Sequence, residues 1–143
     1  MRHPSHTRAP SFGLMLLGLI GCFVAAGCSS GPKVLPTQSH APGSPDQVKL
    51  YPKPPAEYEL LGLVSLDLTP QYRLDDNAHA DAAFTEMIRR AAAMGGNGLL
   101  FEVPPGQSNA SVTAGYHGTF YQVPVNSQGQ RTALAQAIYV VKP

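Results

Sequence analysis

One segment, residues 78–103, constrains the fold of this chain more than any other, because it combines an amphipathic helix, a glycine-rich stop and an apolar strand. Apolar residues in its first part recur with the three- and four-residue spacing of one helix face: Ala80, Phe84, Met87, Ile88, Ala91 and Met94. Gly95 or Gly96 can adopt the left-handed conformation that closes a helix. Residues 99–103 are apolar and precede a pair of prolines, which predicts a short buried strand. We expect the rest of the folded domain to be a sheet that packs against this helix.

The residues at the two ends of the predicted helix indicate where it begins and where it ends. Their order also excludes a phosphate-binding loop. Asp75, Asp76 and Asn77 are candidates for the N-cap, and the negative charge of the aspartates suits the positive end of the helix dipole. The glycines of residues 94–98 follow the helix, whereas a phosphate loop precedes a helix so that free N–H groups point at the anion. These glycines are therefore expected to form a turn.

Four further segments have the character of strands: 49–51, 58–68, 116–125 and 132–142. Alternation in the second of them places one set of side chains on a common face: Tyr58, Leu60, Gly62, Val64 and Leu66. We expect residues 104–115 to be a loop too polar to pack, and residues 126–129 to be a hairpin turn. The resulting order is β-β-α-β-β-β. It predicts an α+β fold in which one amphipathic helix packs on a mostly antiparallel sheet of about five strands.

The N-terminal segment, residues 1–27, has the pattern of a secretory signal peptide. Arg2 and Arg8 form a basic start, and residues 12–26 are fifteen uncharged, mostly apolar residues. A helix of that length covers only about 22 Å, which is shorter than the roughly 30 Å hydrocarbon core of a bilayer. Small residues follow at the expected cleavage site. The pattern predicts export rather than a membrane-spanning helix.

The residues around Cys28, VAAGCSS, resemble the lipobox of bacterial lipoproteins. In that family the cysteine thiol receives a diacylglyceryl group, the signal is cut just before the cysteine, and the new amino group is acylated. Cys22, in LIGC, is a second possible lipobox, but its use would leave the apolar residues 23–27 at the mature terminus. We therefore expect lipidation at Cys28. The serine that follows it implies, by the sorting of enterobacterial lipoproteins, the outer membrane facing the periplasm.

Residues 28–47 are expected to be the lipidated cysteine and a tether, because they are rich in proline, serine and glycine. A flexible tether of this length has a root-mean-square span of about 25 Å. The folded domain is expected at residues 48–143. Without Arg2 and Arg8 the chain keeps eight basic against nine acidic residues, a formal charge of −1, and has no basic stripe. This charge argues against nucleic acid as a partner.

Two motifs of the domain resemble known bacterial families. They are P-x-E-Y-x-x-L-G-x-V-S at residues 55–65 and A-x-x-M-G-G-N-G at residues 91–98, followed by an apolar strand. Together they resemble small uncharacterised envelope lipoproteins related to the stress-sensor lipoprotein of the Rcs phosphorelay. They are also similar to a putative heavy-metal-binding family that shares the strand and the helix end. The resemblance implies an envelope location and a stress-sensing or metal-binding role.

Candidate residues for chemistry are few. His79 lies near Asp75, Asp76 and Asp81, but these donors lack the fixed spacing of a transition-metal site. We expect no metal there and a solvated helix N-terminus instead. His40 lies in the expected tether, and His117 is expected on the surface or edge of a strand. The domain has no cysteine, so it has no disulfide or thiolate nucleophile, and no acid–base pair or nucleophile motif is recognisable.

These observations leave two classes of function. The first is a membrane-anchored, non-catalytic binding, structural or stress-sensing module of the envelope, whose partner is an envelope protein or peptidoglycan. The second is a metal-binding protein or an enzyme at the same location. Polar residues that converge in a pocket are the feature that discriminates between them. We expect the first class, with no catalytic residues and no cofactor.

Overall fold

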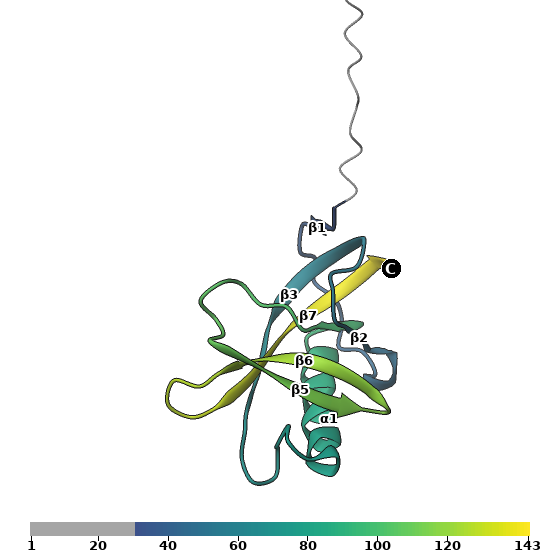
Figure 1. Ribbon diagram of the computed structural model, residues 1–143. Helices are drawn as coiled ribbons and strands as arrows, with labels where there is room; N and C mark the ends of the chain where they lie inside the picture. Colours follow the sequence, from purple (N-terminus) through teal and green to yellow (C-terminus); the bar gives the residue numbers. More distant parts are fainter. Residues whose placement is uncertain (1–30) are drawn as a thin grey trace, which may run out of the picture.

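The computed structural model describes residues 31–143, and these fold into one α+β unit with a single α-helix (Figure 1). The elements in chain order are β1 (Lys33–Leu35), the 3₁₀ turn η1 (Pro45–Gln47), β2 (Lys49–Tyr51), β3 (Glu57–Asp67), α1 (Asn77–Ala93), β4 (Gly98–Leu100), β5 (Ala110–Tyr116), β6 (Thr119–Asn126) and β7 (Thr132–Lys142). The α+β class and the mostly antiparallel sheet are confirmed. The sheet has seven strands rather than about five.

Helix α1 begins and ends as its sequence predicts. The Asp76 side chain accepts a hydrogen bond from the Ala78 amide at 3.0 Å, which is an N-cap. At the other end Gly95 has a φ of +82°, and the amides of Gly95 and Gly96 donate to the carbonyls of Ala92 and Ala91. This pair of bonds is a Schellman motif, for which glycine is the favoured residue. The buried face of the helix contains Ala80, Ala83, Phe84, Met87, Ile88, Ala91 and Ala92.

Strand β7 lies at the centre of the sheet. It pairs antiparallel with β3 along one edge, and with β4 and then β6 at successive positions. The main path of the sheet is β1-β3-β7-β4-β2, with the parallel pairs β1–β3 and β2–β4 at its two edges. Strand β4 is three residues long, shorter than the predicted 99–103. Every strand except β1, β2 and β5 therefore contacts β7 directly.

The two faces of the sheet carry separate apolar clusters. On β7, Ala133, Ala135 and Ala137 lie in the main core beneath the helix, whereas Ile138 belongs to a smaller cluster with Tyr58 and Leu100. Alternation along a strand explains this division. The small alanines let the helix approach the sheet closely.

A β-bulge in β3 makes the predicted common face of that strand wrong. The register shifts between Leu60 and Gly62, which adds one residue to β3 relative to β7. Leu60 therefore pairs with Ile138 in the small cluster, whereas Val64 pairs with Ala135 in the main core. Tyr58 and Leu60 consequently lie on the face opposite to Val64 and Leu66.

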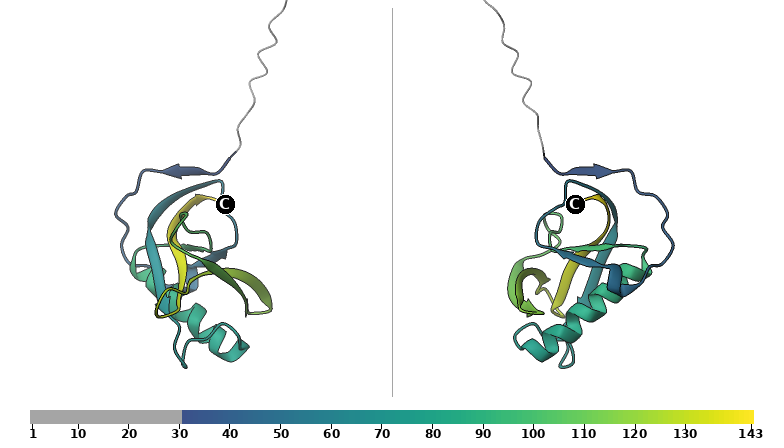
Figure 2. Two further views of the ribbon diagram at one scale, coloured as in Figure 1. Left: turned by 60° about the vertical axis from the view of Figure 1, so that its left-hand side comes forward. Right: turned by 90° about the vertical axis from the view of Figure 1, so that its right-hand side faces the viewer.

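Strands β5 and β6 form a hairpin that covers the helix from a second side (Figure 1; Figure 2). The expected loop at residues 104–115 is wrong for residues 110–115, which belong to β5. The expected strand at residues 116–125 is wrong at its start, since β6 begins only at Thr119. The chain instead reverses at His117 and Gly118, which have φ values of +48° and +80°. Positive φ at both central residues is the conformation of a two-residue hairpin turn.

Residues 31–47, the N-terminal strap, fold onto the domain rather than form a free tether, so the expected domain start at Val48 is too late. Strand β1 adds to the edge of β3, the Thr37 hydroxyl donates to the Leu60 carbonyl at 2.7 Å, and the Gly43 amide donates to the Ala92 carbonyl at 2.9 Å. Figure 2 shows the strap running from β1 around the sheet edge to β2. Within residues 31–143 the first strand therefore begins at Lys33, well before Val48.

Candidate functional site

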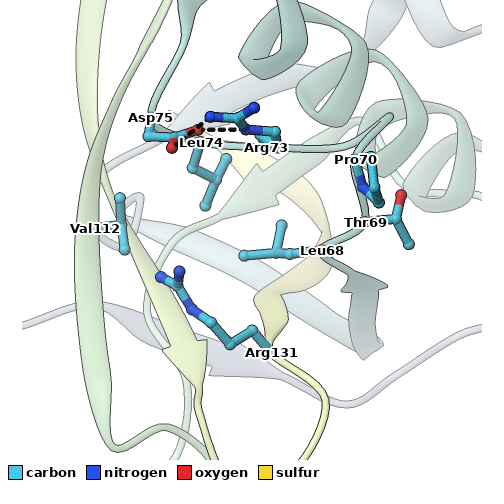
Figure 3. A pocket seen from close by; sticks show the side chains of 8 residues that line it. All are labelled: Leu68, Thr69, Pro70, Arg73, Leu74, Asp75, Val112 and Arg131. Atoms are coloured by element: carbon cyan, nitrogen blue, oxygen red, sulfur yellow. Dashed lines mark hydrogen bonds and ion pairs between the residues drawn. The ribbon is translucent and has the colours of Figure 1, made fainter.

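A pocket opens where β3 ends and the helix has not yet begun. It has a volume of about 370 Å³ and is lined by Leu68, Thr69, Pro70, Arg73, Leu74, Asp75, Val112 and Arg131 (Figure 3). Its residues come from the loop before α1, from β5 and from the turn before β7. The side chains of Leu68 and Leu74 point towards one another, with an arginine on either side in this view. The pocket thus has an apolar floor and a cationic rim.

Arg73 and Asp75 form one wall of this pocket as a bidentate ion pair. Nε and Nη2 of the arginine each donate to a carboxylate oxygen at 2.9 Å. The hydrogen bonds from Arg73, assisted by the nearby charge of Arg131, hold the pKa of the Asp75 carboxyl below its usual value. Asp75 therefore stays ionised and keeps Arg73 in place.

Arg131 is the second cation of the pocket and has a different environment. Its backbone carbonyl accepts a hydrogen bond from the Leu68 amide at 2.8 Å, which fixes the main chain at this point. Within residues 31–143, no side chain forms an ion pair or a hydrogen bond with its guanidinium. Two arginines and one aspartate leave the pocket with one uncompensated positive charge.

The residues singled out in the sequence do not come together at this pocket. The His79 ring lies within hydrogen-bond distance of the cap residue Asp76, at 3.0 Å, while Asp75 pairs with Arg73. His117 lies in the β5–β6 turn beside Tyr116. Residues 31–143 contain no group of three or more histidine, cysteine, aspartate or glutamate side chains placed to hold a metal ion. Cys28 and Cys22 lie outside the described residues.

His40 has a structural role that its sequence context does not suggest. Its ring stacks on Tyr139 with centroids 3.8 Å apart, and its Nε2 lies 2.9 Å from the Glu59 carboxylate. Glu59 is 4% exposed, the only buried charged residue in the described chain, and also accepts a hydrogen bond from the Gln38 amide. The expectation that His40 lies in a free tether is wrong, because these contacts fasten the N-terminal strap to the sheet.

The Thr132 hydroxyl donates to the Asp67 carboxylate at 3.0 Å. No helix among the described residues is long and apolar enough to span a membrane. A comparison of the chain with known protein families, curated proteins and solved structures found no match. The candidate site is the pocket of about 370 Å³, in which the Arg131 guanidinium has no ion-pair partner among residues 31–143.

Proposed function

We propose that this protein is a lipid-anchored module of the bacterial envelope, held through Cys28 at the outer membrane facing the periplasm, and that it binds a ligand without catalysing a reaction. The observation that carries the binding role is the open pocket in which Arg131 has no partner among residues 31–143. The signal pattern of residues 1–27 and the lipobox carry the anchor.

The chemistry of the pocket favours a ligand with one carboxylate attached to an apolar group. A guanidinium presents its N–H groups in a fork that matches a carboxylate, and the single excess positive charge of the pocket matches a single negative charge. Leu68, Leu74 and Val112 offer an apolar floor beside it. Peptide termini provide this combination, either in an envelope protein or in the stem peptides of peptidoglycan.

Titration of residues 31–143 with a peptide and with a peptidoglycan fragment tests whether the pocket binds such a ligand. Purified residues 31–143 are titrated by calorimetry with a soluble muropeptide and with a short peptide that ends in an apolar residue. Arg131→Gln is expected to weaken binding about tenfold, because it removes a charge-assisted hydrogen bond. The control, Arg89→Gln, changes an exposed helix residue and is expected to alter affinity less than twofold. Binding of neither ligand, or equal effects of the two variants, would exclude this site.

Fractionation of cells tests the anchor. Wild-type protein is expected in the outer-membrane fraction, whereas Cys28→Ala is expected either in the soluble fraction or as a precursor that keeps its signal. Cys22→Ala serves as the matched control and is expected to behave as wild type. If Cys28→Ala leaves both the mass and the fractionation unchanged, the anchor is not at this residue.

A further inference from the structure

The sheet has one end at which the N-terminus of the described chain and the end of β7 lie together. Lys33 and Lys142 flank Glu57 in the register of β1, β3 and β7. Val34 and Val141 lie next to these lysines and are 57% and 53% exposed. All views show β1 and the C-terminus at this end, and the helix start and the hairpin β5–β6 further away (Figure 1; Figure 2). We call Lys33, Val34, Val141 and Lys142 the β1 end.

The β1 end exposes two apolar side chains, each next to a lysine in the chain. Among residues 31–143, neither lysine forms an ion pair with Glu57 or with any other acidic group. Isolated exposed valines are ordinary on protein surfaces. Next to lysines at one end of the sheet, they match the chemistry of a bilayer surface, where apolar side chains enter the acyl boundary and cations meet anionic headgroups.

The short segment between Cys28 and β1 determines how far the β1 end can lie from a lipid attached to Cys28. Only four residues, Ser29–Pro32, separate Cys28 from Lys33. Five extended residue steps span at most about 18 Å. Because the strap is fastened to the domain by β1, Thr37, His40 and Gly43, it cannot unroll without breaking these contacts. A lipid on Cys28 therefore holds the β1 end next to the headgroups.

We propose that the β1 end is a membrane-contact surface that seats the domain on anionic phospholipid. This inference rests on the lipid anchor of the proposed function. It also sets the position of the arginine pocket, because the pocket lies at the far end of β3 from β1. The eleven residues of β3 extend about 35 Å, so the pocket faces away from the membrane into the periplasm.

Tryptophan reporters in the lipidated full chain test the contact, because the sequence has no tryptophan of its own. Val34→Trp places an indole at the β1 end, and Phe120→Trp places a matched indole at the exposed far hairpin, where Phe120 is 73% exposed. Each protein is reconstituted in vesicles of phosphatidylcholine and phosphatidylglycerol, with and without bromine on the acyl chains. We expect about twofold lower fluorescence from Val34→Trp in the brominated vesicles, as for a side chain at the acyl boundary, and no change from Phe120→Trp. Val141→Trp replaces the first reporter if that variant does not fold.

The outcomes separate this inference from the proposed function. If the wild-type chain does not float with vesicles more than Cys28→Ala, the anchor fails and the inference fails with it. If the wild-type chain floats but neither β1-end reporter is quenched, the anchor stands and the membrane-contact surface is wrong. Equal quenching of Val34→Trp and Phe120→Trp also overturns the inference, because that result is expected for a domain with no fixed orientation on the membrane.

Discussion

A single side chain, that of Glu59, holds the N-terminal strap on the sheet. It is buried, and its carboxylate accepts hydrogen bonds from the His40 ring at 2.9 Å and from the Gln38 amide at 2.8 Å. The hydrogen bond with His40 is the main reason that the pKa of Glu59 lies below its usual value. A lowered pKa in the folded state means that the ionised carboxylate stabilises the fold above the pKa of the unfolded chain. This stabilisation is lost as the pH falls through the folded pKa.

We predict that Glu59→Gln lowers stability near neutral pH and makes the remaining stability less sensitive to acid. The amide cannot ionise, so this variant lacks the contribution that wild-type protein loses below about pH 4.3, the ordinary glutamate pKa. Denaturant melts of residues 31–143 at a series of pH values measure the effect. His79→Ala is the control, since its ion pair with Asp76 is 41% and 46% exposed and is expected to contribute little. Parallel pH curves for Glu59→Gln and wild type would contradict the argument.

At the scale of the element, helix α1 is held between the main sheet and the β5–β6 hairpin. Phe84 is 1% exposed, and its ring lies within 5.6 Å, centroid to centroid, of the rings of Phe101, Tyr116 and Tyr121. One side chain thus joins the helix to both layers that cover it. The opposite face carries Glu86, which accepts hydrogen bonds from Arg89 and Arg90 and has its pKa lowered to about 2, chiefly by Arg89.

We predict that Phe84→Ala brings the domain close to unfolding. Truncation of a buried phenylalanine costs about 3–5 kcal/mol through lost transfer energy and the cavity left behind. A domain of this size has about 5–10 kcal/mol of stability in total. Arg89→Ala is the matched control on the same helix; its side chain is 61% exposed, and we expect a change below about 0.5 kcal/mol. Denaturant melts compare the two, and a larger loss in Arg89→Ala would contradict this account of the helix face.

Helix α1 and strand β7 could be predicted because the spacing of apolar residues in their sequences matches the spacing of their buried residues. Strand β5 could not, since Ser111 and Thr113 are polar and only Ala114 is buried; cross-strand pairing with β6, not an apolar face, defines it. The bulge in β3 could not be predicted either, because leucines occupy residues 60, 61 and 63 and fit either face of the sheet. The strap escaped prediction because backbone hydrogen bonds and a histidine, rather than apolar residues, attach it to the sheet.

For the whole molecule, the pocket marks the limit of what the sequence alone can predict. Arg73, Val112 and Arg131 meet there from three distant parts of the chain, through the path of β3, the hairpin and β7. None of the three belongs to a recognisable motif. Only the fold places Arg131 beside an apolar floor, while Arg73 is already paired with Asp75.

The central position of β7 also sets the order in which the sheet can form as the chain is made. Every other described element precedes β7, yet β3, β4 and β6 each need it as a pairing partner. A ribosome releases residues 132–142 after all of these, so the sheet cannot close while β7 is still inside. The sheet therefore stays open until β7 is released. For a chain that is exported as we propose, this is also the unfolded state that a narrow export channel requires. The many sequence-distant contacts of such a sheet slow this final step further.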